Sequence, residues 1–330
     1  MWEQITSFEN MLSAFHQAAK GKRSKKCVAD FELNLEQELF GLIEALESGQ
    51  YMPGKYTQFS IRSPKQRLIS AAPFRDRVVH HALCNIIEPI FERRFIFDSY
   101  ANRKGKGTHR ALDRCTSYMR KYTYVLPLDI VQFFPSIDHT ILLNALDRVI
   151  SCEKTLALCA LIVRSGAALG GEGQALGLPI GNLTSQFWAN VYLNPLDHFI
   201  KRALKCRGYI RYVDDMLLFS DDKSQLLAWK HALIAYLAQL KLRLHVNSAQ
   251  ARPCRDGLPF LGFQVFPDHR RLKRRKAVQA RRHLKSLAGK YHAGSASYET
   301  LEAAIQSWIG HVQHGDTWGL RSAILREIVL

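Results

Sequence analysis

The sequence contains no long apolar run, no Cys-x-x-Cys motif and few acidic residues. No segment approaches the roughly 18 to 20 consecutive apolar residues that a membrane-spanning helix needs. The first ten residues, MWEQITSFEN, lack the basic and apolar stretches of a secretory signal. The seven cysteines are odd in number and scattered, which argues against a disulfide framework or a zinc site. These absences predict a cytoplasmic protein with reduced thiols and no membrane partner.

Apolar and basic residues are the abundant ones. Hydrophobic side chains make up 47% of the 330 residues, which is enough for a large core in two or three subdomains. Lys and Arg number 46 against 29 Asp and Glu, so the formal net charge is +17. Such an excess favours a polyanionic partner, and nucleic acid is the first candidate.

Hydrophobic periodicity predicts a mixture of helices and strands. Helical patterns cover about 2–19, 33–46, 75–95, 138–165, 183–205 and 222–240. Residues 56–74 are typical of a hairpin, 122–134 of a buried strand, and 242–246 and 260–266 of short strands. A basic helical tail follows from residue 267. This irregular order predicts an α+β fold rather than a regular βαβ series.

Two adjacent carboxylates, Asp214 and Asp215, lie between strand-forming residues in the stretch RYVDDMLLFS. Like charges side by side repel, and a divalent cation would turn that repulsion into coordination. A solvated turn is the alternative interpretation, because Asp is common at hairpin tips.

A third carboxylate, Asp129, lies in the apolar stretch PLDIVQFFPSID. A charge in such a run is costly unless it is paired or bound to a metal, although backbone N–H groups or a nearby Arg could also satisfy it. Three carboxylates that meet at one point could hold two Mg²⁺ ions for an in-line phosphoryl transfer.

Several segments resemble, in order, the motifs of reverse transcriptases. LDIVQFFPSID (128–138) and YVDD (212–215) are similar to the two metal-binding motifs of the family. KQRLISAAPFRDRVVHHAL (65–83), SYANRKGKGTHRAL (99–112), GLPIGNLTSQFWANVYLNPLD (177–197), FLGF (260–263) and SWIGHVQHGDTWGLR (307–321) resemble further blocks. The resemblance covers about residues 50–325. It implies an α+β right-hand polymerase with a helical N-terminal extension (1–50), fingers and palm (51–266) and a basic helical thumb (267–330).

The resemblance also implies roles for individual residues. Asp129, Asp214 and Asp215 would be catalytic and, with Ile130 beside them, would hold two Mg²⁺ ions, which Mn²⁺ can replace. The nucleotide-binding residues would be Lys65, Arg67, Phe134, Ile180, Gly181 and Gln186. The residues that contact template and primer would be Arg103, Lys104, Lys106, Phe260, Leu261, Gly262, Arg274 and Arg275. The implied partners are an RNA template, a primer or cDNA, and deoxynucleoside triphosphates.

Alternatives remain open for some of these residues. The Phe134 ring would lie under the sugar of the nucleotide and exclude a 2′-hydroxyl, or it could belong to the core. The basic residues could lie on solvated faces instead of holding phosphates. Asn247 and Ser248 stand where many relatives have a lysine that protonates pyrophosphate, so no general acid is assigned.

The segment that resembles the nucleotide-pocket motif indicates a subfamily of reverse transcriptases. Most bacterial reverse transcriptases carry QGxxxSP, whereas this chain has IGNLTSQ at 180–186. That variant resembles the bacterial or phage enzymes of diversity-generating retroelements, which copy a template RNA with errors opposite adenines and work with an accessory protein. A defence-associated or unclassified bacterial reverse transcriptase is the alternative, and a non-catalytic RNA-binding scaffold is a further one.

Overall fold

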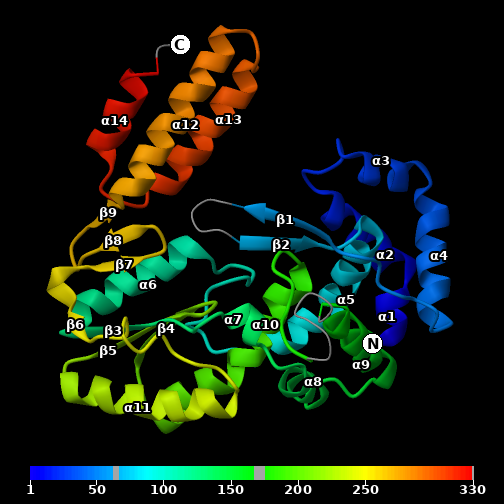
Figure 1. The fold of residues 1–330 in the computed structure, drawn as a ribbon, viewed down its shortest axis with the longest axis horizontal. Helices are drawn as coiled ribbons and strands as arrows, with labels where there is room; N and C mark the ends of the chain where they lie inside the picture. Colours follow the sequence, from blue (N-terminus) through cyan, green and yellow to red (C-terminus); the bar gives the residue numbers. More distant parts are fainter. Residues whose placement is uncertain (62–66, 167–174, 329–330) are drawn as a thin grey trace.

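The computed structural model describes residues 1–61, 67–166 and 175–328. The chain begins with four helices and a projecting hairpin, continues through a mixed central region and ends in three helices (Figure 1). The N-terminal elements are α1 (Trp2–Thr6), α2 (Phe8–Ala19), α3 (Lys26–Leu33), α4 (Leu35–Glu47), β1 (Thr57–Ile61) and β2 (Arg67–Ala71). The predicted hairpin at 56–74 is thus confirmed.

The central region surrounds a four-stranded antiparallel sheet. Its helices are α5 (Phe74–Glu92), α6 (Thr108–Lys121), α7 (Phe133–Ser136), α8 (His139–Asp147), α9 (Glu153–Ser165), α10 (Leu183–His198) and α11 (Lys223–Gln239), with a π-helical turn at Phe199–Ala203. The strands are β3 (Tyr124–Leu128), β4 (Gly208–Tyr212), β5 (Asp215–Ser220) and β6 (Arg252–Pro253), and their order is β4-β5-β3-β6.

Helices cover both faces of this sheet, so the middle of its central strand β5 is apolar on both faces. Along β5, Met216 and Leu218 join the larger core, which includes α10 and α11, while Leu217 and Phe219 join a second core with α6. This alternation follows from the two-residue period of a strand. The larger core also takes in buried residues of α1 to α4, so the N-terminal helices share one interior with the central region.

We use the name thumb for the C-terminal helices α12 (Arg274–His292), α13 (Tyr298–Val312) and α14 (Trp318–Arg326), because they lie in the segment where the resemblance predicts one. They have a separate hydrophobic cluster that includes Leu284, Leu301 and Ile324. A three-stranded sheet of β7 (Leu258–Phe260), β8 (Phe263–Val265) and β9 (Arg270–Leu272) leads into them. Figure 1 shows the thumb standing apart from the N-terminal helices, with the β1–β2 hairpin between the two.

Three strand predictions need correction. The short strand expected over 260–266 is interrupted by a turn at Leu261 and Gly262, which separates β7 from β8. The strand expected over 122–134 ends at Leu128, because Gln132 adopts a left-handed φ of 45° and turns the chain into α7. Residues 242–246 form only a single bridge, between Leu244 and Ile130, since β3 has already ended at that level. Among the described residues, no helix is long and apolar enough to span a membrane.

Candidate active site

Asp129 lies directly after β3, where the strand leaves the sheet. Its carbonyl oxygen accepts a hydrogen bond from the His245 N–H at 2.9 Å, and the Val131 N–H donates to the Arg243 carbonyl at 2.8 Å. These bonds fix the backbone on both sides of Ile130. The side chain of Asp129 lines a cleft of about 780 Å³ that also contains Asp215.

Asp214 is presented by a two-residue turn between β4 and β5. Tyr212 pairs with Asp215, so Val213 and Asp214 form the tip. Val213 has a φ of 58°, a left-handed conformation that is rare for a β-branched residue. Such a residue costs on the order of 1–3 kcal/mol and persists only where its surroundings hold it.

The electrostatic environment couples Asp214 to Asp129. Burial raises the pKa of Asp214 above its ordinary value, and the negative charge of Asp129 raises it further, while Arg67 and Arg211 oppose the shift. Asp129, directly after β3, and Arg67, in β2, therefore lie close enough to Asp214 to act on its charge. The fold thus brings together Arg67, Asp129 and Asp214, which lie far apart in the sequence.

These residues fit a divalent cation. Asp129 and Asp214 offer carboxylate oxygens whose mutual repulsion a cation would relieve, and hard oxygen donors are what Mg²⁺ prefers. Ile130 directly follows Asp129 and is bridged to Leu244, and its role as a metal ligand stays a prediction. No three His, Cys, Asp or Glu side chains within the described part of the chain are gathered as a metal-binding group, and Asp215 is exposed. Asp129 and Asp214 are therefore the core of the candidate site.

The cleft beside this site is lined by cations and by the predicted primer-contact segment. Phe260, Leu261 and Gly262 all face it, and Leu261 and Gly262 form a turn with φ values of 44° and 92°. Lys273, directly before α12, and Lys276, in its first turn, also line the cleft, whereas the predicted Arg274 and Arg275 do not. The phase of α12 explains the difference, since residues three apart share one face of a helix.

Asp215 and Lys273 face each other across the cleft. The carboxylate of Asp215 opposes the lowering of the Lys273 pKa that burial causes. A basic run in a sequence does not reveal which of its members point inward, so only the fold could identify Lys273. His311 of α13 also reaches the cleft.

The segment IGNLTSQ is anchored to the β1–β2 hairpin. The Ile180 carbonyl accepts a hydrogen bond from the Ser70 N–H at 2.9 Å, and Gly181 has a φ of 122°. The Ile180 side chain is half-buried and Gln186 is exposed. Phe134 is half-buried at the edge of the larger core, and its carbonyl accepts from the Leu178 N–H at 2.9 Å. The roles of these residues stay predictions, and Lys65 lies outside the described residues.

Gly181→Ala is expected to destabilise the protein and weaken primer extension. A Cβ at this position would lie 2.8 Å from the Ile69 Cγ2, a methyl group on a stiff β-branched side chain, and the φ of 122° is also unfavourable for alanine. We expect a loss of about 1–3 kcal/mol in the free energy of unfolding. Gly49→Ala is the control, because Gly49 has a φ of 73° and open space around it. Equal losses in urea melts of the two variants would refute the close contact.

Arg103 and Lys106 are held by intramolecular contacts. The Arg103 guanidinium donates to both carboxylate oxygens of Glu92 at 2.6–3.0 Å and to two backbone carbonyls, and its side chain is only 5% exposed. The Lys106 Nζ donates to the Phe97 carbonyl at 2.8 Å and lies 3.3 Å from the centre of the Phe97 ring. This geometry does not favour the expected phosphate contact of Arg103, because all three nitrogens of its guanidinium already donate to protein acceptors.

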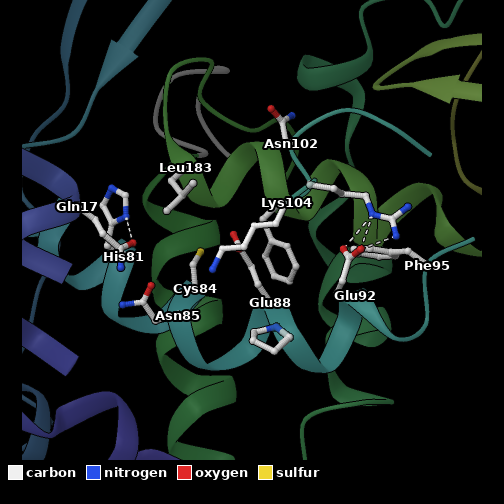
Figure 2. Close-up of a pocket in the computed structure, with 13 residues that line it drawn as sticks. Gln17, His81, Cys84, Asn85, Glu88, Glu92, Phe95, Asn102, Lys104 and Leu183 are labelled. Carbon is white, nitrogen blue, oxygen red and sulfur yellow. Dashed lines mark hydrogen bonds and ion pairs between the residues drawn. The ribbon is translucent and has the colours of Figure 1, made fainter. Parts of the chain in front are cut away.

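Lys104 lines a separate pocket of about 370 Å³ between α2, α5 and α10. Figure 2 shows its side chain extending across this pocket near Glu88, and its charge lowers the pKa of Glu88, although burial raises that pKa overall. Lys104 therefore lies on a different surface from the cleft beside Asp129. Its contact with template or primer stays a prediction.

Comparison with known proteins places this geometry in context. Residues 57–265 match the family model described as reverse transcriptase (RNA-dependent DNA polymerase). Protein YkfC of Escherichia coli (strain K12) is 26% identical over 277 residues, which are 71% of this chain and 73% of YkfC. The group II intron-encoded protein LtrA of Lactococcus lactis subsp. cremoris is 26% identical over 170 residues, 50% of this chain but only 28% of LtrA.

A solved structure supports the same fold. Apo telomerase from Candida tropicalis matches with a TM-score of 0.55 and 10% identity, over 84% of this chain and 63% of the telomerase chain. At that identity the likeness concerns the fold alone. It confirms the expected α+β right-hand architecture.

Proposed function

Because this chain belongs to the reverse transcriptase (RNA-dependent DNA polymerase) family, we propose that it extends a DNA primer along an RNA template at Asp129, Asp214 and Asp215. The observation that carries the proposal is the electrostatic coupling of Asp129 and Asp214 beside a cation-lined cleft. A carboxyl group whose pKa is raised by burial and by a like-charged neighbour, beside a cleft, is typical of a functional site.

The chain's own residues divide the work of the reaction. Asp129 and Asp214 would hold Mg²⁺, which when bound stabilises the attacking and leaving oxygens of a phosphoryl transfer. Arg67 lies beside Asp214, so its planar guanidinium can bind the triphosphate of a nucleotide at two points. Lys273 and Lys276 supply positive charge for the backbone of the template–primer duplex, and Phe260 to Gly262 support the primer end.

Primer extension on an RNA template tests this function. The purified chain should add deoxynucleotides to an annealed DNA primer in Mg²⁺ or Mn²⁺ and should stop when EDTA is added. The assay should be repeated with the proteins and RNA encoded beside the gene, since we also propose that an accessory protein assists the enzyme. Absence of extension under both conditions would refute the polymerase proposal.

We further propose that the enzyme is the error-prone polymerase of a diversity-generating retroelement. The support is the motif IGNLTSQ, in which Ile180 replaces the usual glutamine. The isoleucine side chain has no donor or acceptor, so it cannot make a polar check on the nascent base pair. Apolar contacts discriminate by only about 1–3 kcal/mol per group, so a pocket that relies on them should select weakly.

Ile180→Gln and Ile180→Asn are expected to lower the error rate, which in the wild type should be high chiefly opposite template adenines. Arg67→Ala should also lower it at some cost in rate, because binding energy shared by right and wrong nucleotides does not improve selection. The measurement is cDNA sequencing from an RNA template of balanced composition. Ile234→Gln, at an exposed position on α11, is the control and should leave errors unchanged. Wild-type errors that are rare or evenly spread would leave an ordinary bacterial reverse transcriptase.

A further inference from the structure

A fully buried ion pair lies directly behind the turn that presents Asp214. Arg211, in β4, donates from Nε to Asp197 Oδ1 at 2.8 Å and from Nη2 to Asp197 Oδ2 at 2.6 Å. Both side chains have 0% exposure. The Tyr209 hydroxyl donates to the same Asp197 oxygen at 2.8 Å. Buried ion pairs are seldom more stabilising than apolar residues of similar volume, so stability alone does not account for this pair.

The third nitrogen of the guanidinium reaches the strained turn. Arg211 Nη1 donates to the Val213 carbonyl at 3.1 Å and to Asn190 Oδ1 at 3.0 Å. Val213 is the residue with a φ of 58° and directly precedes Asp214. Because Asp197 holds the other two nitrogens, the guanidinium cannot rotate away from the Val213 carbonyl without breaking a buried charge pair.

Asn190 and the backbone of Arg211 are themselves held by further hydrogen bonds. Asn190 Nδ2 donates to the Ala101 carbonyl at 2.9 Å, which fixes the orientation of its amide. The Arg211 backbone is also held, since its N–H donates to the Asp98 backbone carbonyl at 2.9 Å and its carbonyl accepts from the Tyr100 N–H at 3.0 Å. The turn is therefore tied to α10 and to the loop before α6 through Arg211.

We propose that Asn190, Asp197 and Arg211 are positioning residues, which hold the Val213 turn so that the Asp214 carboxylate stays at the cation site beside Asp129. None of the three would touch the nucleotide or the metal. This inference rests on the proposed metal-dependent polymerase function. It predicts that loosening the network weakens cation binding, even though the carboxylates themselves remain.

The test compares Asn190→Ala and Asp197→Asn with the wild-type chain. Direct Mn²⁺ binding to the protein without nucleic acid is followed by electron paramagnetic resonance of the free ion. We expect both variants to bind Mn²⁺ about tenfold more weakly, the range typical for residues that orient metal ligands. In primer extension, the Mg²⁺ concentration for half-maximal rate should rise, while template–primer affinity measured in EDTA should not change.

Two control variants remove similar contacts elsewhere. Asn10 Nδ2 donates to the Ala82 carbonyl at 3.0 Å, and buried Asp76 accepts from the Tyr51 hydroxyl at 2.9 Å and the Gly54 N–H at 2.8 Å. Asn10→Ala and Asp76→Asn should lose stability but keep wild-type Mn²⁺ affinity. All variants are first compared by circular dichroism, and Asn190→Ala, which keeps the buried Arg211–Asp197 ion pair, decides the outcome if Asp197→Asn does not fold.

Unchanged Mn²⁺ affinity in folded Asn190→Ala would overturn the positioning role, as would equal weakening in the two controls. A wild-type chain that binds Mn²⁺ but never extends a primer would instead refute the proposed polymerase function. The two failures are thus separate, because the first is read in the binding measurement and the second in the wild-type assay.

Discussion

Asp214→Ala is expected to abolish primer extension while leaving template–primer affinity close to that of the wild-type chain. The substitution removes one of the two coupled carboxylates, and loss of a metal ligand takes away transition-state charge stabilisation of about 4 kcal/mol or more, roughly a thousandfold in rate. The cations that face the nucleic acid, including Lys273 and Lys276, are unaffected. Gel-based extension and a filter-binding assay on the same preparation measure the two effects.

The same variant should not be less stable than the wild-type chain in metal-free buffer. Because the pKa of Asp214 is raised in the folded state, its carboxyl contributes stability at low pH, and that contribution is lost as the pH rises through the folded pKa. At neutral pH the ionised group opposes folding, so removing it should leave the unfolding temperature equal or higher. Asp147→Ala, at an exposed position at the end of α8, is the control and should retain extension. Extension by Asp214→Ala near the wild-type rate would refute the metal-site assignment.

The sequence predicts well those features that depend on local periodicity. The strand-forming residues on either side of Asp214 and the helical spacing in α5 and α11 are features of residues that are neighbours along the chain, and the structure confirms these elements. The strand expected over 122–134 extends too far because an apolar stretch cannot by itself show where pairing stops. Pairing with β5 ends at Leu128, opposite Met216.

Contacts between distant segments could not be predicted from the sequence. Arg103 is typical of a phosphate-binding loop residue, but Glu92 on α5 occupies its guanidinium. Arg211 is a charged residue in an apolar strand, yet nothing in the sequence identifies Asp197 as its partner. The orientation of α12 likewise decides that Lys273 and Lys276, rather than Arg274 and Arg275, face the cleft. Each of these outcomes depends on how two elements pack together, which local propensity does not specify.

Phe134→Ala is expected to let ribonucleotides compete with deoxynucleotides. Phe134 belongs to α7, which begins four residues after Asp129, and its backbone is held by the hydrogen bond from the Leu178 N–H. A ring fixed in this way would overlap a 2′-hydroxyl, and forced overlap costs about 1–3 kcal/mol. We therefore expect the ratio of kcat/KM for ribonucleotides to that for deoxynucleotides to rise by roughly 5- to 150-fold.

Single-nucleotide incorporation with matched ribo- and deoxynucleoside triphosphates measures this ratio, and Phe133→Leu is the matched control. The Phe133 ring lies 5.4 Å from that of Phe134 but is buried in the core, so shrinking it should cost stability without changing sugar selection. If Phe134→Ala leaves selection unchanged while lowering stability as a core substitution does, Phe134 is part of the core. If both variants relax selection equally, the effect comes from loosening α7 as a whole, and no single ring acts as the gate.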